Sequence, residues 1–276
     1  MKILILFLVV MSAQITTAQS LKVMTYNIRL DVASDGVNQW SNRKDKVYAL
    51  LIKYDPDFIG VQEALHHQLM DIKKNLPEYE SIGVGRDDGK EKGEYSAILY
   101  KKNKFEVLEQ STAWLSLTPE IPGSKSWDAA ITRIATWGRF KITSSQKIFL
   151  LLNTHFDHIG KEARKNSALL IQQWVHEIRK KYNDEVIVTG DFNIERHEAP
   201  YSIMMNETNT FHDTKPPSEK QGTFCTFTIN SEPCKGIDYI FVTSNWKVSM
   251  YQVIEDNDGT YYPSDHLPVM ITATLK

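Results

Sequence analysis

Acids, amides and imidazoles recur where the apolar runs of this sequence end. The clearest case is Asp191 and Asn193, in the stretch Gly-Asp-Phe-Asn that follows the apolar run at residues 185–189. Other runs end in, or lead directly into, residues of the same kinds: Asn27, Glu63, His155, Asp238, and Asp265 with His266. Each residue alone is typical of a turn or a helix cap. Together, at one rim of a fold, they would form a cleft of carboxylates, amides and imidazoles.

This set of side chains suits Mg²⁺ and phosphate chemistry. Mg²⁺ prefers oxygen ligands, and one or two carboxylates leave coordination positions for water and a substrate phosphate. Carboxylates outnumber imidazoles in the set and no cysteine belongs to it, so a structural zinc site matches poorly. A carboxylate such as Asp191 can orient and deprotonate water, while His and Asn donors stabilise charge on phosphoryl oxygens. The predicted reaction is hydrolysis of a phosphoester with Mg²⁺, or Mn²⁺, as the cofactor.

Short apolar strands and amphipathic helices alternate along the chain and would position these residues. Periodicity predicts strands at residues 21–28, 58–61, 96–100, 105–108, 131–142, 147–154, 186–189, 237–242 and 269–275. It predicts helices at residues 43–53, 65–76 and 161–181. No linker or repeat divides the chain, and several strand pairs are expected to be antiparallel. We therefore predict one α/β domain over residues 21–276, a four-layer α/β/β/α sandwich of two mainly antiparallel sheets flanked by helices.

The beginning of the chain has the pattern of a secretory signal. Lys2 precedes an apolar stretch at residues 3–11 that is too short to span a bilayer, and small residues lead to Ala18. We predict a signal peptide over residues 1–18, with a buried N-terminal strand as the alternative. The mature protein is then expected to be secreted or periplasmic, without a transmembrane segment, and monomeric.

The overall charge gives no sign of a nucleic-acid or membrane partner. The formal net charge is -2, with 42% hydrophobic and 24% charged residues among 276. This composition is globular and produces no general basic field. A local group of basic residues or a bound cation can still attract a polyanion, so charged substrates stay open.

The ordered motifs resemble those of the endonuclease/exonuclease/phosphatase superfamily. They are Thr25-Tyr-Asn27-Ile, Gln62-Glu63, Asn153-Thr-His155, Gly190-Asp-Phe-Asn193, Ile237-Asp238-Tyr and Ser264-Asp-His266. A single one of these motifs is weak, whereas the ordered series covers nearly the whole mature chain and is specific. The superfamily includes pancreatic deoxyribonuclease, abasic-site endonucleases, neutral sphingomyelinases, inositol polyphosphate phosphatases and nocturnin-like deadenylases. The resemblance implies the same four-layer fold and a Mg²⁺-dependent phosphoesterase activity.

The resemblance also implies which residues hold the metal and the water. Asn27 and Glu63 would form the metal site, with Glu63 as the direct ligand. Asp265 would join them or bind a second ion. Asp191 would position the attacking water, and Asn193 would contact the phosphate.

Two imidazoles complete the set that the resemblance implies. His155 and His266 would hold the phosphate and stabilise its transition state. Asp238 would orient His266. Through a looser local match, Glu94 would orient His155. The other histidines, including His158, are expected to be surface or packing residues.

A stretch rich in Trp, Pro and Ser at residues 113–130 is predicted to be a long functional loop. Trp114 and Trp127 would offer aromatic faces to a base or a sugar ring, with core packing as the alternative. Arg133 follows the loop and would bind a phosphate bidentately, or else pair with a surface carboxylate. These residues are the predicted substrate-binding set.

Several questions stay open at this point. Cys225 and Cys234 flank a short polar segment and either close a hairpin as a disulfide or remain free thiols. The substrate could be a nucleic acid, a nucleotide, a sugar phosphate or an inositol phosphate. A sphingomyelinase-like activity is least expected, because no apolar insertion marks a lipid-facing surface. The alternative to an enzyme is a binding protein that keeps the fold without turnover.

Overall fold

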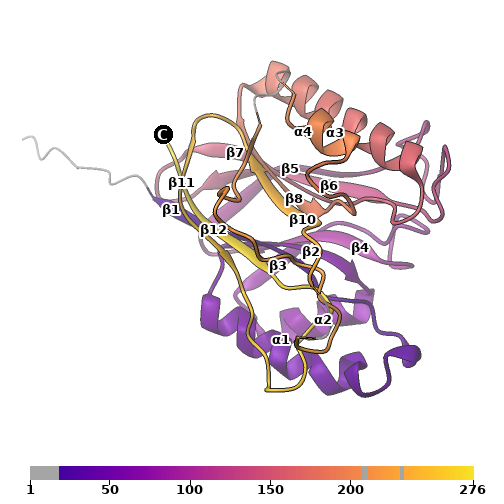
Figure 1. Cartoon of the computed structure of the whole chain (residues 1–276). Coiled ribbons are helices and arrows are strands. Elements are labelled where there is room, and N and C mark those ends of the chain that lie inside the picture. The colour runs from indigo at the N-terminus through magenta and orange to yellow at the C-terminus, as the bar shows by residue number, and fades with distance from the viewer. Residues whose placement is uncertain (1–18, 207–210, 231–232) are drawn as a thin grey trace, which may run out of the picture.

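The chain folds into two stacked sheets with helices on their outer faces (Figure 1). The structure, a computed structural model, describes residues 19–206, 211–230 and 233–276, so the predicted signal peptide lies outside the described residues. The first sheet has the order β11-β12-β1-β2-β4-β3. Its strands are β1 (Ser20–Asn27), β2 (Phe58–Ala64), β3 (Tyr79–Ile82), β4 (Tyr95–Lys101), β11 (Trp246–Val253) and β12 (Val269–Leu275).

The second sheet has the order β5-β6-β7-β8-β10-β9. Its strands are β5 (Phe105–Trp114), β6 (Ile134–Ile142), β7 (Ile148–His155), β8 (Glu185–Asp191), β9 (His212–Asp213) and β10 (Asp238–Val242). One parallel pair lies in each sheet, β1 with β2 and β7 with β8, and the remaining neighbours are antiparallel. The predicted sandwich of mainly antiparallel sheets is confirmed.

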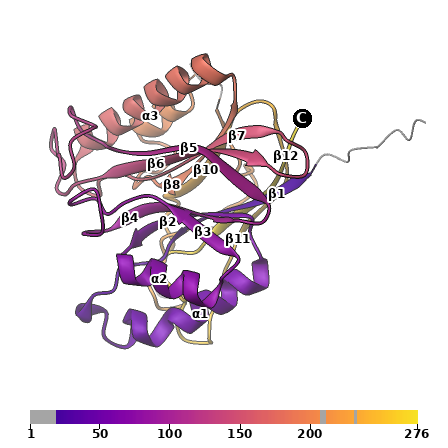
Figure 2. The same ribbon diagram turned by 180° about the vertical axis from the view of Figure 1, so that it is seen from behind.

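Helices cover both outer faces of the sandwich (Figures 1 and 2). On the first sheet lie α1 (Trp40–Tyr54) and α2 (His66–Asn75), preceded by the short 3₁₀ helix η1 (Ala33–Asn38). On the second sheet lie α3 (Lys161–Tyr182) and α4 (Ala199–Met204). Both long helices end at a residue in the left-handed conformation, Asp55 (φ 49°) after α1 and Asn183 (φ 56°) after α3. Such a cap satisfies a terminal carbonyl and turns the chain back toward the sheet.

The central strands of each sheet are buried on both faces, so alternate residues of such a strand contribute to different cores. In β1, Leu21 and Val23 point into the layer between the sheets. Met24 and Tyr26 contribute to the other core, which packs against α1 and α2. This alternation follows from the two-residue repeat of a strand. The strands consequently read as nearly continuous apolar runs, which is why most were recognisable in the sequence.

Five elements were not predicted from the sequence: β3, β9, β11, α4 and the 3₁₀ helix η1. In the edge strand β11 only Trp246 is buried, and Lys247, Ser249 and Gln252 are exposed. The strand β5 extends to Trp114, so the predicted loop at residues 113–130 begins later than expected.

A buried polar link joins the two sheets beneath the edge where β1, β2, β7 and β8 end. Asn153 on β7 donates from Nδ2 to the carbonyl of Val61 at 2.8 Å, across the gap between the sheets. Its Oδ1 accepts from Gln62 Nε2 at 2.7 Å and from Thr189 Oγ1 at 3.0 Å. A Cβ on Gly60 would lie 2.2 Å from Thr189 Oγ1, so only glycine leaves room for this link.

Candidate active site

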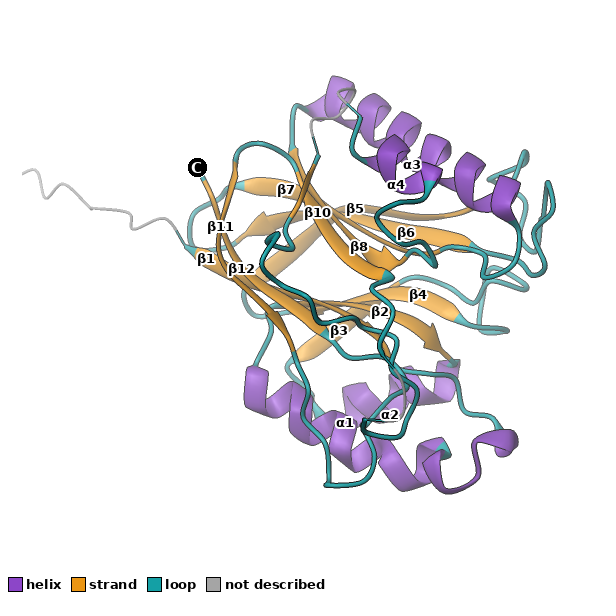
Figure 3. Cartoon of the chain, viewed as in Figure 1, coloured by secondary structure: helices purple, strands orange, loops and turns teal. Residues whose placement is uncertain are grey.

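The strand ends of both sheets meet around a cleft of about 440 Å³. The strands that lead to it are coloured orange in Figure 3. Eight of the residues singled out in the sequence line this cleft: Glu63, Glu94, Arg133, His155, Asp191, Asn193, Asp265 and His266. Asn27 and Asp238 do not line the cleft but are hydrogen-bonded to residues that do: Asn27 to Glu63 and Asp191, and Asp238 to His266. The structure thus brings together residues that are up to 239 positions apart in the chain.

Asn27, the last residue of β1, connects the acids of the two sheets. Its Nδ2 donates to Glu63 Oε1 and to Asp191 Oδ2, each at 3.0 Å. Its Oδ1 accepts from the backbone N–H of Arg29 at 3.0 Å, which fixes the orientation of the amide. Asn27 is completely buried, so its amide holds the two carboxylates in a constant relation at the base of the cleft.

Glu63 lies where the pairing of β2 with β4 is interrupted by a register shift. Its backbone has φ 61°, a conformation that non-glycine residues rarely adopt. The backbone N–H of Leu30 donates to Oε2 at 3.3 Å, and Arg29 Nη1 lies 3.8 Å from the same oxygen. Burial opposes ionisation, but the Asn27 hydrogen bond and the nearby cations outweigh it and lower the pKa of Glu63. The irregular strand end therefore presents an ionised carboxylate to the cleft.

Asp191 ends β8 and is held by its neighbours in the sequence and in space. The backbone N–H of Asn193 donates to Asp191 Oδ1 at 3.0 Å, with Asn193 in the left-handed region at φ 50°. Asn193 Nδ2 donates to the carbonyl of Phe156 at 3.0 Å and lies 3.1 Å from His155 Nε2. Burial and the neighbouring Asp238 raise the pKa of Asp191. This carboxyl is therefore more basic than an exposed aspartate.

The two imidazoles lie in opposite electrostatic surroundings. His266 Nδ1 lies 2.9 Å from Asp238 Oδ2, and its Nε2 lies 3.7 Å from Asp191 Oδ2. Burial lowers the pKa of His266, but these two carboxylates outweigh it and raise the pKa. His155 Nδ1 accepts from Arg133 Nη1 at 2.9 Å, and burial together with this guanidinium lowers the pKa of His155. One imidazole is thus cationic and the other neutral at neutral pH.

Arg133 is a buried cation of the cleft rather than a surface residue. It is 6% exposed, so the alternative of a surface ion pair is wrong. Glu94 Oε2 accepts from Arg86 Nη1 at 2.6 Å and lies 3.7 Å from Arg133 Nη1. The expectation that Glu94 orients His155 directly is also wrong, because Arg133 Nη1 lies beside Nδ1 of that ring. Glu94 reaches His155 through the arginine.

The donor groups of the cleft match a divalent cation. Oxygen atoms of Glu63 and Asp191 and a nitrogen of His155 lie within 4.8 Å of one another. Asp265 borders the same cleft, 3.8 Å from Arg29 Nη1, and burial raises its pKa. Buried carboxylates at such spacing repel one another, and a bound cation offsets that repulsion. Oxygen donors of this kind are the ones that Mg²⁺ prefers.

The two predicted stacking tryptophans do not line the cleft. Trp114 is the last residue of β5, is 4% exposed, and donates from Nε1 to the carbonyl of Arg86 at 2.6 Å. The expectation that it offers a face from a loop is therefore wrong. Trp127 is half-buried outside the cleft lining. The next residue, Asp128, accepts from the backbone N–H of Ala163 at 2.7 Å and so ties this segment to the beginning of α3.

Further cleft residues were missed or misjudged from the sequence. His158, expected to be a surface or packing residue, borders the cleft with its Nδ1 3.5 Å from Arg133 Nη2. The others are Arg29, Leu30, Ile131, Glu195, Glu198, Phe224, Lys235 and Ile237. Arg29 and Glu195 could have been predicted to border the cleft, because each lies two residues after an asparagine of the site. Phe224 and Lys235 do not follow a site residue in this way. They pair with each other in the hairpin around Cys225 and Cys234, and the packing of that hairpin brings them to the cleft.

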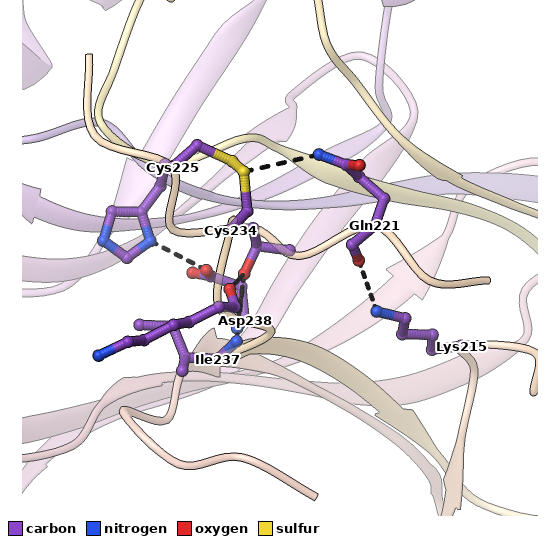
Figure 4. The surroundings of a disulfide bond; sticks show 9 residues. Lys215, Gln221, Cys225, Cys234, Ile237 and Asp238 are labelled. Atoms are coloured by element: carbon purple, nitrogen blue, oxygen red, sulfur yellow. Dashed lines mark hydrogen bonds and ion pairs between the residues drawn. A yellow bond between two sulfur atoms is a disulfide. The ribbon is translucent and has the colours of Figure 1, made fainter. Parts of the chain in front are cut away.

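That hairpin is closed by a disulfide between Cys225 and Cys234, whose Cα atoms are 4.3 Å apart (Figure 4). The alternative of two free thiols is therefore wrong. The backbone N–H of Cys225 donates to the carbonyl of Asp265 at 3.0 Å. Thr223 Oγ1 accepts from the backbone N–H of Asp238 at 3.1 Å. The cross-linked hairpin thus contacts both sides of the pair formed by Asp238 and His266.

The four-layer sandwich, with a cleft of acids, amides and imidazoles at its strand ends, defines a class of α/β-sandwich nucleases and phosphatases. Residues 24–266 match the Endonuclease/Exonuclease/phosphatase family, and the chain belongs to that family. This confirms the resemblance seen in the ordered motifs.

Several solved structures are similar to the chain over nearly its whole length. A family protein from Bacteroides vulgatus is 40% identical with a TM-score of 0.85, and the match covers 94% of this chain and 100% of that one. A mannosyl-6-phosphatase from Bacteroides thetaiotaomicron is 38% identical with a TM-score of 0.86, over 92% of this chain and 100% of that one. The human Nocturnin catalytic domain, at 18% identity and a TM-score of 0.74 over 93% and 95%, shares the fold. Within the described residues, no helix combines the length and apolar character needed to cross a membrane.

Proposed function

We propose that this protein is a divalent-metal-dependent hydrolase of phosphoester bonds. The observation that carries the proposal is the position of Asn27, whose amide binds Glu63 and Asp191 at 3.0 Å each. These two hydrogen bonds join an acid of the first sheet to an acid of the second, and Asp191 in turn lies close to both His155 and His266. Every acid, amide and imidazole expected of a phosphoesterase is present, which favours an enzyme over a binding protein with the same fold.

Glu63 and Asp265 are the carboxylates that would hold the cation, Mg²⁺ or Mn²⁺, and Asn27 would complete the metal site by orienting Glu63 through its amide. When bound, the ion would supply positive charge to the phosphoryl oxygens and lower the barrier to displacement. Glu63 has the depressed pKa of an ionised ligand. Its hydrogen bonds to Asn27 and Leu30 would keep it oriented whether or not the cation is bound.

The side chains of the cleft would carry out the displacement itself. Asp191 orients a water and takes one of its protons as the new oxygen–phosphorus bond forms. The phosphorus–oxygen bond of the ester breaks, and the departing alkoxide takes a proton from solvent. Cationic His266, held by Asp238, stabilises the phosphoryl oxygens, and Asn193 donates to them from its amide.

His155 and Arg133 support the same phosphate from the other side. The hydrogen bond from Arg133 to Nδ1 places the imidazole proton of His155 on Nε2, which faces Asp191 at 3.3 Å. The Nε2–H can then donate to a phosphoryl oxygen. Arg133 borders the cleft and adds a fixed positive charge, as a phosphate requires. Glu94 positions Arg133 rather than taking part directly.

We infer that the substrate is a sugar phosphate. The mannosyl-6-phosphatase of Bacteroides thetaiotaomicron, 38% identical over 92% of this chain, supports a phosphomonoester carried on a sugar. Nucleic acid, nucleotides and inositol phosphates are the competing substrates. We further propose that residues 1–18 act as a signal peptide for a secreted or periplasmic monomer made of the domain at residues 21–276.

The test is release of inorganic phosphate or alcohol from a substrate panel in the presence of Mg²⁺ or Mn²⁺. The panel contains mannose 6-phosphate, glucose 6-phosphate, a nucleoside monophosphate, an inositol phosphate, bis(p-nitrophenyl) phosphate and a single-stranded oligonucleotide. We expect turnover of the hexose phosphates to exceed that of the oligonucleotide. If no member of the panel is hydrolysed with either cation, the proposal is wrong and the chain is a binding protein.

A further inference from the structure

One wall of the cleft is not used by the reaction described above. It consists of Phe224 and Ile237 from the disulfide-linked hairpin, with Glu195 from the segment after β8. The ring of Phe224 lies 5.0 Å from that of His266, measured between centroids and at an interplanar angle of 51°. The aromatic face of Phe224 therefore lies beside His266, a residue that would hold the phosphate.

Glu195 presents a half-buried carboxylate on the same wall. Its backbone N–H donates to Glu198 Oε1 at 2.8 Å, and the second oxygen of Glu198 lies 3.7 Å from Arg164 Nη2. Within residues 19–206, 211–230 and 233–276, the carboxylate of Glu195 itself has no hydrogen bond or ion pair. A carboxylate is a pure acceptor, so it is available to groups that donate, such as hydroxyls.

The charges around the cleft oppose a long polyanion. Arg29 borders the cleft, but its guanidinium makes two hydrogen bonds of 3.0 Å to Asp35. Lys235 is exposed on the hairpin and faces a cleft that also contains Glu195 and Glu198. Proteins that follow a nucleic-acid backbone need basic side chains for several successive phosphates. The acids on this wall would repel a second phosphate instead.

We propose that Phe224 and Glu195 form a subsite for the uncharged, hydroxyl-bearing ring of a phosphomonoester. The carbon–hydrogen face of the ring packs on Phe224, and a ring hydroxyl donates to Glu195. Apolar contact combined with a few directed polar groups is the usual composition of a small-molecule site. This assignment rests on the proposed phosphoesterase function and adds the residues that select the alcohol part of the substrate.

The test compares two monoesters in Glu195→Ala. Mannose 6-phosphate offers ring hydroxyls, whereas p-nitrophenyl phosphate offers a ring without them. We expect the ratio of kcat/KM for mannose 6-phosphate to kcat/KM for p-nitrophenyl phosphate to fall at least about tenfold, the size expected for a hydrogen bond to a charged group. The loss should lie mainly in KM. Glu120→Ala, which changes an exposed acid outside the cleft, should keep the wild-type ratio.

A second variant separates packing from selection. Phe224→Leu keeps an apolar side chain but removes the aromatic face, and we expect kcat/KM to fall for both ring-bearing substrates relative to glycerol 3-phosphate. An unchanged ratio in Glu195→Ala, or an equal loss on all substrates, would overturn the subsite while leaving the proposed function intact. If the wild-type protein hydrolyses none of these esters with Mg²⁺ or Mn²⁺, the proposed function itself fails.

Discussion

The space between the two sheets has an apolar end and a polar end, and they are built on different principles. At the apolar end, the ring of Phe58 lies 4.3 Å from Phe105, 4.8 Å from Phe140 and 5.4 Å from Phe149. At the polar end, Asn153 is hydrogen-bonded to groups of both sheets. The strands β2 and β7 run through both ends.

The difference shows how one fold separates stability from function. Burial of aromatic rings is non-directional and stabilises the stacked sheets in proportion to the area removed from water. A buried hydrogen bond adds less net free energy but requires a specific geometry, and an unmatched group is costly. We therefore expect changes at the apolar end to affect unfolding and changes at the polar end to affect turnover as well.

The largest expected effect on stability comes from Phe58→Ala. Removing this buried ring leaves a cavity among three other rings and should lower the free energy of unfolding by about 3–5 kcal/mol. Urea denaturation measures the change, and Phe58→Leu should show a smaller one. Turnover per folded molecule should stay close to wild type, and a selective loss of turnover would contradict the separation of the two ends.

Asp191→Asn should have the largest effect on catalysis. Loss of the carboxylate that accepts the proton of water should reduce kcat at least about a hundredfold, and His266→Ala should do the same by removing a charge-stabilising donor. The unfolding free energy of Asp191→Asn should not fall much, because the acid it replaces is buried beside Asp238. Near-normal kcat on the best substrate would show that the site is misassigned.

Asn153→Ala should lower both the free energy of unfolding and kcat, each by less than the variants above. It removes the hydrogen bond that Asn153 donates to the buried Val61 carbonyl and one of the three acceptors of Gln62 Nε2, which costs about 1–3 kcal/mol of stability. Gln62 precedes Glu63, and Asn153 lies two residues before His155, so kcat should fall as well. Thermal unfolding and kcat measured together test this, and a stable variant with normal kcat would show that the polar link does not position the cleft.

Trp127→Ala should have the smallest effect. Because Trp127 lies outside the cleft lining, KM for the best substrate should change by no more than about twofold, which is typical of positions away from a site. Steady-state kinetics on wild type and variant provide the comparison. A KM increase confined to ring-bearing substrates would restore the stacking role that the sequence suggested for this tryptophan.

Much of the candidate site could be predicted from the sequence, because its residues end apolar runs that had to be strands. Asn27, Glu63, His155 and Asp191 came together because each parallel pair ends at the same edge of its sheet. The contact between Asp238 and His266 was implied by the resemblance of the ordered motifs, and the structure has it at 2.9 Å.

Other features depend on contacts that no local pattern encodes. Arg133, just before β6, lies between Glu94 and His155. Its guanidinium contacts both residues, so Glu94 has no direct contact with the ring. Trp114 is buried because β5 extends beyond the predicted strand and still pairs with β6 there, with Trp114 opposite Ile134. The subsite at Phe224 depends on how a distant hairpin packs against the segment of His266.

The most direct test of the central claim is the Mg²⁺ dependence of phosphate release by the wild type and by Glu63→Gln, with Glu120→Gln as the matched control. After dialysis against EDTA, the wild type and the control should be inactive and should recover along the same Mg²⁺ saturation curve. Glu63→Gln should need a much higher Mg²⁺ concentration, because a neutral amide replaces an ionised ligand, while its thermal unfolding stays close to wild type. Full activity in excess EDTA, or identical Mg²⁺ curves for all three proteins, would contradict a metal-dependent site built around Glu63.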